Sequence, residues 1–170
     1  MNMRTAWVAT ALAFVAFGAS GQQPPAPGCE TPEHRQFDFW VGDWTVTAEG
    51  KPAGENRIEK ILKGCALLEN WTGASGHQGK SLNFYDVRRG VWHQTWIDHN
   101  GMALALDGRF EDGKMTLTGQ QKDLSTGVTI LHRITWSPLP SGEVRQLWDT
   151  SMTDGKAWTV QFDGLYRRKP

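Results

Sequence analysis

The chain has 170 residues, and its 18 Lys and Arg side chains balance its 18 Asp and Glu side chains. Without a basic excess it lacks the electrostatic footprint of a protein that binds nucleic acid or an anionic membrane surface. Its length suits a single domain with a hydrophobic core of its own.

The first residues have the three parts of a secretory signal peptide. Arg4 precedes an apolar run over residues 6–17, and the small residues 18–21 follow. The apolar run is shorter than the roughly 20 residues that a membrane-spanning helix needs. We therefore predict a cleaved signal peptide at 1–21 and a periplasmic or secreted protein with no integral membrane segment after cleavage.

Residues 22–30 have the composition of an extended, Pro-rich leader, and a single domain is predicted over 31–170. The chain has two cysteines, Cys29 and Cys65. In an oxidising compartment such a pair is expected to form a disulfide, which would tie the leader to the domain. A redox pair is the alternative, but the C-x-x-C spacing is missing.

The domain is predicted to open with a short helix. Thr31 suits the N-cap position, Pro32 suits the first helical position, and Gly42 ends the pattern. An apolar stripe runs through this region at helical spacing: Phe37, Trp40, Val41 and, beyond Gly42, Trp44.

Beyond Gly42 the hydrophobic pattern changes to a period of two, which indicates β-strands. Turn dipeptides that end in glycine recur along the chain, among them Asn100-Gly101 and Asp112-Gly113. Consecutive hairpins of this kind predict an all-β fold. We expect an antiparallel meander of eight to ten strands that closes into a barrel, with one short N-terminal helix.

Hairpin pairing divides the strand residues between two faces of the sheet. One face is aliphatic: Leu82, Phe84, Ile97, Leu104, Leu106, Phe110, Met115, Leu117, Ile130, Ile134, Leu147, Val160 and Phe162. The other combines tryptophans with amides and charges. The free energy of burial favours the aliphatic face inside. The alternative is a polar, Trp-lined cavity inside, and a β-bulge could exchange the faces along any strand.

The second face supplies the candidate ligand-binding residues: Asn83, Tyr85, Trp92, Gln94, Trp96, Arg133, Gln146 and Trp148. Aromatic rings stack on a ligand, planar amides offer paired donors and acceptors, and a guanidinium binds a carboxylate through two hydrogen bonds. These residues predict a polar or aromatic small molecule as the partner. The alternative is that they form cross-strand pairs that stabilise the sheet.

The sequence contains no nucleophile, metal or phosphate-binding motif. The catalytic residues are therefore unknown, and no metal site is predicted. If the chain is an enzyme, its acid–base groups would come from Glu69, Asp98 or His132, with Arg133 as electrostatic support.

The run from Phe37 to Trp44, F-D-F-W-V-G-D-W, resembles the opening of a family of secreted bacterial proteins of unknown function. Later segments such as Trp92-His93-Gln94-x-Trp96 resemble that family too. The Gly42-x-Trp44 step is also similar to calycins, which include lipocalins, fatty-acid-binding proteins and nitrobindins. This resemblance implies a calycin-like barrel closed at one end. No cofactor is expected, but nitrobindins bind haem through a histidine, and His132 is the nearest analogue.

Three functions remain open at this stage. The first is an exported small-molecule-binding β-barrel protein. The second is an enzyme, a lyase, isomerase or hydrolase, on a calycin-like barrel. The third is an envelope protein-interaction module that exposes the Trp-bearing face. The sequence leaves the oligomeric state open.

Overall fold

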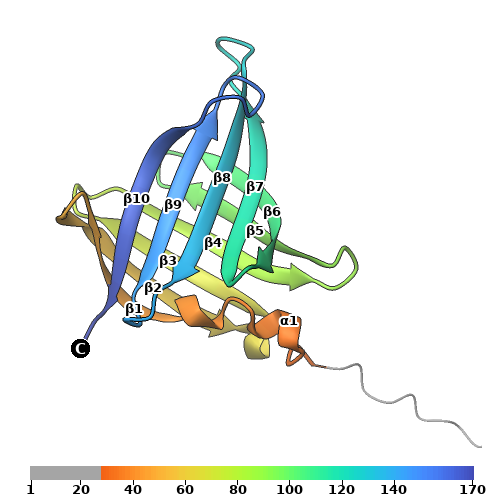
Figure 1. The fold of residues 1–170 in the computed structure, drawn as a ribbon, viewed down its shortest axis with the longest axis vertical. Helices are drawn as coiled ribbons and strands as arrows, with labels where there is room; N and C mark the ends of the chain where they lie inside the picture. The colour runs from red at the N-terminus through yellow and green to blue at the C-terminus, as the bar shows by residue number, and fades with distance from the viewer. Residues whose placement is uncertain (1–27) are drawn as a thin grey trace, which may run out of the picture.

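The computed structural model describes residues 28–170, so the predicted signal peptide and most of the leader lie outside the described residues. These residues form a closed antiparallel barrel in which each strand pairs with its neighbours in sequence and β1 pairs with β10 (Figure 1). The strands are β1 (Gly42–Ala48), β2 (Lys51–Ile61), β3 (Ala66–Gly73), β4 (Gln78–Asp86), β5 (Val91–Asp98), β6 (Ala103–Glu111), β7 (Lys114–Lys122), β8 (Thr129–Pro138), β9 (Val144–Ser151) and β10 (Thr159–Arg168). This confirms the predicted all-β meander and is consistent with a calycin-like barrel.

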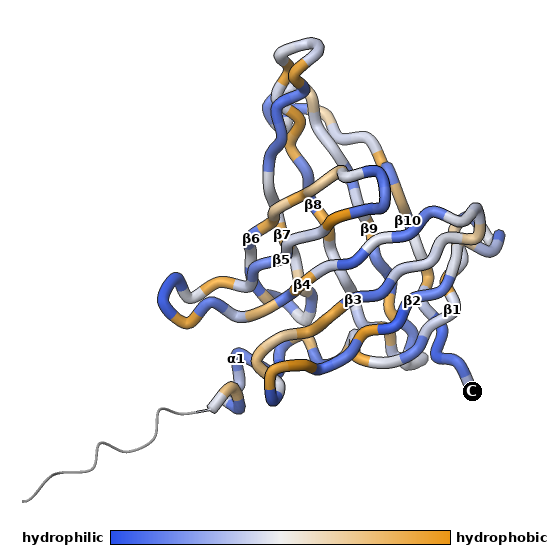
Figure 2. The backbone as a smooth tube through the Cα atoms, turned by 180° about the vertical axis from the view of Figure 1, so that it is seen from behind, coloured by the Kyte–Doolittle hydropathy of each residue, from blue (hydrophilic) through white to orange (hydrophobic). Residues whose placement is uncertain are grey.

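Alternation of polar and apolar residues runs along many of these strands (Figure 2). The turn between β6 and β7 shows how local chemistry fixes a hairpin. Asp112 and Gly113 both have positive φ, 51° and 75°, which suits a tight two-residue turn. Phe110 consequently pairs with Met115, which is the register that a two-residue turn at Asp112-Gly113 requires.

The predicted N-terminal helix is divided into two short pieces. The α-helix α1 spans Pro32–Arg35, and the 3-10 helix η1 spans Asp38–Trp40. Trp44, which shares the helical spacing but follows the predicted end at Gly42, belongs to β1, where it pairs with Asn56 and Arg168. The apolar spacing therefore indicated burial correctly, although it continues from the helical segment into a strand.

The two helices close one end of the barrel (Figure 1). The indole Nε1 of Trp44 donates to the carbonyl oxygen of Trp40 at 2.9 Å. The guanidinium of Arg168 lies 4.4 Å from the centre of the Trp44 ring and donates to the carbonyl oxygen of Val41 at 3.0 Å. The predicted disulfide is present at this end, between Cys29 and Cys65 beside the 3-10 helix η2 (Leu62–Gly64).

The hairpin between β5 and β6 differs from the prediction by one residue. A two-residue turn at Asn100-Gly101 would place Trp96 opposite Ala105, whereas the structure pairs Trp96 with Leu104. Because side chains alternate along a strand, a shift of one residue moves every side chain beyond the turn to the other face.

The carboxylate of Asp98 stabilises the longer turn between β5 and β6. Its Oδ1 accepts hydrogen bonds from the backbone N–H groups of Asn100 and Met102, at 2.9 Å each. As a result, the Trp and amide face points inward on β4 and β5, whereas the aliphatic face points inward on β6 and β7. Leu82 and Ile97 are 38% and 52% exposed on the outer surface. The expectation of one aliphatic face inside throughout the barrel is therefore wrong for β4 and β5.

A similar shift affects β8 and β9. The predicted pairing puts Arg133 and Gln146 on one face. The structure has a turn at residues 139–143 and pairs Trp136 with Gln146 and Arg133 with Asp149. Gln146 therefore points into the barrel together with Trp136, while Arg133 points to the outside.

The interior has two distinct halves. The packed half, next to α1, is filled by large side chains that are each at most 2% exposed: Phe37, Trp40, Trp44, Trp92, Met115 and Trp136. Phe37 stacks on Trp40 with ring centroids 4.9 Å apart and meets Trp136 edge-on at 5.2 Å. The other half, called the hollow half below, contains the cavity. In residues 28–170, no helix has both the length and the apolar character needed to cross a membrane.

Candidate functional site

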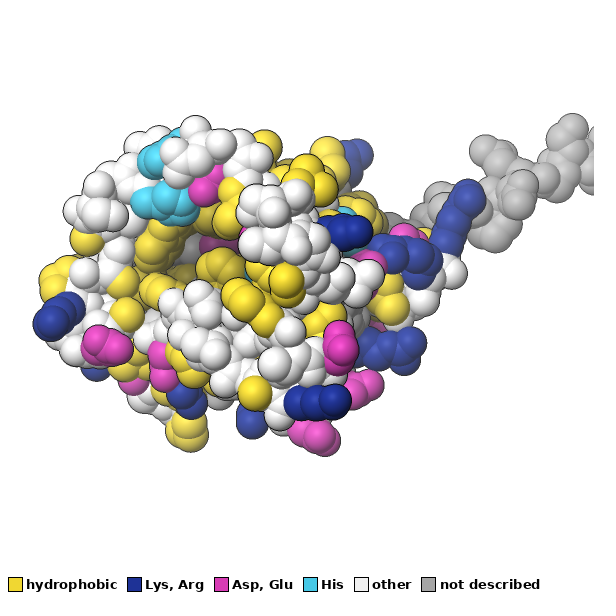
Figure 3. Space-filling model, turned by 90° about the horizontal axis from the view of Figure 1, so that it is seen from above, with side chains coloured by type: hydrophobic (Ala, Val, Ile, Leu, Met, Phe, Trp, Pro, Cys, Tyr) yellow, Lys and Arg dark blue, Asp and Glu magenta, His cyan; other side chains and the backbone are white. Residues whose placement is uncertain are grey.

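The hollow half contains a cavity of about 310 Å³. Viewed from the end opposite α1, the barrel is visibly hollowed, and histidine side chains lie near the opening (Figure 3). The cavity is within the size range of small-molecule sites. Its lining residues are Ala53, Glu69, Trp71, Gly73, Ser75, His77, Gln94, Trp96, Leu104, Ile134, Gln146, Trp148, Gln161, Phe162 and Tyr166.

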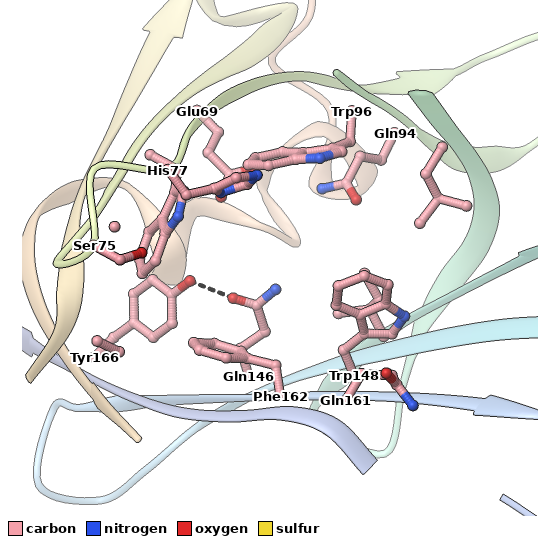
Figure 4. Close-up of a pocket in the computed structure, with 15 residues that line it drawn as sticks. Glu69, Ser75, His77, Gln94, Trp96, Gln146, Trp148, Gln161, Phe162 and Tyr166 are labelled. Carbon is pink, nitrogen blue, oxygen red and sulfur yellow. Dashed lines mark hydrogen bonds between the residues drawn. The ribbon is translucent and has the colours of Figure 1, made fainter. Parts of the chain in front are cut away.

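Aromatic rings form much of the cavity wall. Trp96 comes from β5, and Trp148 and Phe162 face it from β9 and β10 (Figure 4). Trp71 comes from β3 and meets Phe162 edge-on. The Trp96 ring lies against β4 at Gly79. Glycine leaves room for it, because a Cβ atom at this position would lie 2.1 Å from the indole ring. Any larger residue at this position would push the ring out of place.

A β-bulge enlarges the contribution of β10. The register between β9 and β10 shifts between Val160 and Phe162, so Gln161 is the extra residue. Gln161 and Phe162 consequently both line the cavity, although neighbours on a regular strand would face opposite sides. Gln161 is also tied to the wall, since its Nε2 donates to the Thr150 hydroxyl at 3.1 Å.

A chain of hydrogen bonds borders the cavity beneath the aromatic wall and ends at a buried carboxyl group. Gln94 Nε2 donates to Asn83 Oδ1 at 2.7 Å, and Asn83 Nδ2 donates to Ser81 Oγ at 2.8 Å. Ser81 Oγ donates to Glu69 Oε2 at 2.5 Å, and Asn56 Nδ2 donates to Glu69 Oε1 at 2.7 Å. Glu69 is only 4% exposed, and it accepts hydrogen bonds from two sides.

Burial raises the pKa of Glu69 to about 7, and the hydrogen bonds from Ser81 and Asn56 offset part of this increase. Tyr166 lies nearby and donates to Gln146 Oε1, as Figure 4 shows. Burial, followed by the charge of Glu69, raises the pKa of Tyr166 well above its ordinary value. The cavity therefore combines a carboxyl group that titrates near neutrality with a phenol that stays protonated.

The open end carries a second polar cluster. His77 Nε2 lies 3.0 Å from Asp98 Oδ2, and the rings of His77 and His99 are 5.0 Å apart. The hydrogen bond with His77 lowers the pKa of Asp98 to about 2. Asp98 is therefore ionised at neutral pH, and it serves as a turn and rim residue rather than a proton donor.

Half of the eight predicted ligand-binding residues line the cavity: Gln94, Trp96, Gln146 and Trp148. Asn83 is buried behind them and positions Gln94. Tyr85 and Trp92 lie toward α1, where Trp92 Nε1 donates to Gln36 Oε1 at 3.1 Å.

Arg133 is not part of this group. Its guanidinium makes two hydrogen bonds of 3.0 Å to the Asp149 carboxylate and lies 4.0 Å from the centre of the Trp158 ring. Its side chain is 39% exposed on the outside of the barrel. The predicted carboxylate-binding fork is therefore absent from the cavity, because the shifted register of β8 and β9 turns Arg133 outward.

Sequence reasoning missed several residues of the site. The sequence names Glu69 only as a candidate acid–base group of an enzyme, without placing it in a cavity, and it assigns Trp71 and Tyr166 to neither face. The sequence does contain a signal for this site. Leu67, Glu69 and Trp71 occupy every second position of β3 and therefore share one face of the strand, as Ser81 and Asn83 do on β4. Joining those two strands requires the pairing of Glu69 with Ser81, which the Gly-rich connection between them does not specify.

Within residues 28–170, no cluster of three or more His, Cys, Asp or Glu side chains is placed to hold a metal ion. His132 is buried, its ring stacks on Trp148, and its Nδ1 accepts from Trp148 Nε1 at 3.2 Å. It does not line the cavity.

Comparison with protein-family models finds no match to this chain, and comparison with curated proteins finds none either.

Proposed function

We propose that this chain is an exported small-molecule-binding protein whose ligand occupies the hollow half of the barrel. The observation that supports this best is the cavity itself, which combines aromatic walls, three glutamine amides and an open end. A barrel that only needed a stable core would gain more from filling this space, since unfilled apolar volume costs stability. Space kept free beside ordered polar groups favours a ligand site.

The lining suggests the general shape of the ligand. Trp96 and Trp148 offer flat faces for stacking, and Trp71 and Phe162 meet edge-on with ring centroids 6.1 Å apart. The amides supply donors and acceptors at defined positions. A compact molecule with a planar or apolar body and a few polar groups fits this combination best.

Export is supported by the disulfide, because such bonds persist in oxidising compartments. The signal-peptide pattern of residues 1–21 points the same way. Membership of the secreted bacterial family with the F-D-F-W-V-G-D-W opening is part of this proposal. Within this run, Trp40 and Trp44 are buried and help to close one end of the barrel. The run therefore relates to the fold and gives no information on which ligand is bound.

Native mass spectrometry of protein purified from the cells that produce it tests this function. We expect a complex heavier than the bare chain by the mass of one small molecule, and we expect the Leu104→Trp variant, which fills the cavity, to lose it. An absorbance spectrum of the same sample identifies any chromophore. A bare chain mass under gentle ionisation, with no change on adding extracts of those cells, would contradict the proposal.

A second candidate is acid–base catalysis, which one observation favours. A carboxyl group with a pKa near 7 at a cavity is typical of functional sites. Both oxygens of Glu69 already accept hydrogen bonds, however, and this arrangement suits a fixed acceptor better than a group that exchanges protons with a substrate.

The third candidate, a protein-interaction module, requires the Trp-bearing face to be exposed. The structure gives this candidate less support, because Trp92 is 2% exposed and Trp96 and Trp148 line the cavity.

A further inference from the structure

Glu69 is a buried carboxyl group without a positive partner. It is 4% exposed, and its hydrogen bonds come from Asn56 and Ser81, which are both neutral. Among the residues that the structure describes, no Lys, Arg or His side chain makes an ion pair with it, and no Lys or Arg lines the cavity. A buried charge normally has a partner of opposite sign, because leaving water alone is costly.

The hydrogen-bond network around Glu69 is directional. Ser81 Oγ accepts from Asn83, so its single hydrogen is directed at Glu69 Oε2. Asn83 is held in turn by Gln94. The amide of Asn56 donates to the other carboxyl oxygen. These neutral groups present hydrogens to Glu69 from two sides, which is the arrangement that an ionised carboxylate needs.

We infer that the missing partner of Glu69 is the ligand, and that the cavity takes a protonated amine carried on a compact, largely apolar or aromatic body. This inference rests on the proposed function. The ammonium group lies at Glu69, and the body lies between the tryptophan rings. The cavity thus completes, on binding, an ion pair that the free protein lacks.

The rest of the lining suits a cation. The faces of Trp71, Trp96 and Trp148 carry the negative part of the aromatic quadrupole, which attracts ammonium groups. Gln94 uses its Nε2 on Asn83, and its Oε1 accepts no hydrogen bond from the described residues, so it can accept a second N–H of the ligand. An anionic ligand would meet a carboxyl group and would find no Lys or Arg on the wall.

Two other titratable side chains line the cavity with Glu69. Tyr166 remains neutral, because burial and the charge of Glu69 raise its pKa well above its ordinary value. His77 lies at the rim, where its Nε2 is 3.0 Å from Asp98 Oδ2. Amine binding is expected to weaken as the pH falls through about 7, where Glu69 becomes protonated, and a Glu69 variant separates this effect from that of the other groups at the cavity.

Isothermal titration calorimetry with three matched probes tests the inference. The probes are 2-phenylethylamine, 2-phenylethanol and 3-phenylpropionate, which are cationic, neutral and anionic. We expect the amine to bind at least about tenfold more tightly than the alcohol, and the propionate more weakly than both. In the isosteric Glu69→Gln variant this preference for the amine should fall to about twofold or less. Asp163→Asn, which removes a carboxylate on the outer surface, is the control for net charge and should retain the preference.

A pH series on the unaltered protein provides an independent readout that does not require the variant to fold. Between about pH 8 and about pH 6 the affinity for the amine should decrease about tenfold, while that for the alcohol should stay constant. Equal or tighter binding of the alcohol or propionate overturns the amine inference and leaves the cavity as a binding site. If none of the probes binds at millimolar concentration and the protein also carries no ligand from its producing cells, the proposed function itself is overturned.

Discussion

The packed and hollow halves of the barrel are built by the same strands. On β5, Trp92 fills the packed half, whereas Gln94 and Trp96, further along the same face, border the cavity. On β9, Val144 is buried in the packed half, whereas Gln146 lines the cavity. One continuous inward-facing row of side chains therefore packs the core at one end of the barrel and lines the cavity at the other.

The two halves differ in the hydrogen bonding of their buried polar side chains. In the packed half, the indole Nε1 atoms of Trp40 and Trp136 are buried without a hydrogen-bond partner among the described residues. In the hollow half, Ser81, Asn83 and Glu69 are buried and linked to one another, although Asn56 Oδ1 and His132 Nε2 also lack a partner among the described residues. Ring packing therefore outweighs unmade hydrogen bonds where the barrel is full, and a chain of hydrogen bonds orders part of the wall where space is left open.

The largest expected effect comes from truncating the packed half. Trp40→Ala removes a fully buried ring that packs on Phe37 at 4.9 Å and Trp136 at 5.3 Å. We expect it to lower the free energy of unfolding by about 3–5 kcal/mol in urea denaturation followed by circular dichroism. Trp96→Ala at the cavity wall should cost less than about 2 kcal/mol. Similar losses for the two variants would show that the division into halves is wrong.

The disulfide gives the next largest effect. It joins residues separated by 36 positions in sequence, at the α1 end of the barrel. Replacing both Cys29 and Cys65 with Ala should reduce the free energy of unfolding by about 3–4 kcal/mol, because the unfolded chain regains conformational freedom. Probe affinity, measured by calorimetry, should stay within about twofold of the unaltered protein. A large loss of affinity with little loss of stability would instead place the disulfide in the support of the cavity.

The sequence predicts the architecture well because the signals involved are local. Turn dipeptides such as Asp112-Gly113 specify a hairpin and its register within a few residues. The register at Asn100-Gly101 was predicted wrongly, because it depends on the side chain of Asp98, which accepts two backbone hydrogen bonds across the turn. A single such contact reverses the faces of every later strand until another shift occurs.

The site was less predictable than the fold for the same reason. Gln94 and Trp96 were placed correctly relative to Asn83, since the short β4–β5 connection fixes their pairing. Arg133 was misplaced, because its face depends on the wider turn between β8 and β9. The importance of Glu69 depends on its burial and its lack of a positive partner, and neither property is visible in one sequence.

The pH dependence of stability tests the polar network of the hollow half. Glu69 has a pKa of about 7 in the folded protein against an ordinary value of 4.5. Between these values the folded state binds the proton more tightly than the unfolded state, so stability decreases as the pH rises. Relative to Glu69→Gln, the unaltered protein should lose on the order of 3 kcal/mol across this window, measured by urea denaturation at each pH. Parallel curves for the two proteins would mean that Glu69 is well solvated.

The smallest expected effect gives the closest comparison of the two halves. Leu104 and Leu106 both point inward from β6 and are 3% and 1% exposed. Leu104 lines the cavity, whereas Leu106 does not, and a Cβ atom added at Gly119 would lie only 2.8 Å from Leu106 Cδ2. Leu106→Trp should therefore destabilise the protein by about 1–3 kcal/mol through overpacking.

Leu104→Trp adds the same side chain two residues away, where the ring can enter the cavity. We expect it to change the free energy of unfolding by less than about 1 kcal/mol, because the added atoms fill empty volume instead of displacing neighbours. The same variant should lose binding of 2-phenylethylamine by calorimetry. If Leu104→Trp is as destabilising as Leu106→Trp, the cavity is too rigid or too small to accept a ring, and it could not hold an aromatic ligand either. Tolerance of the new ring together with loss of binding would place the ligand in the volume that this indole occupies.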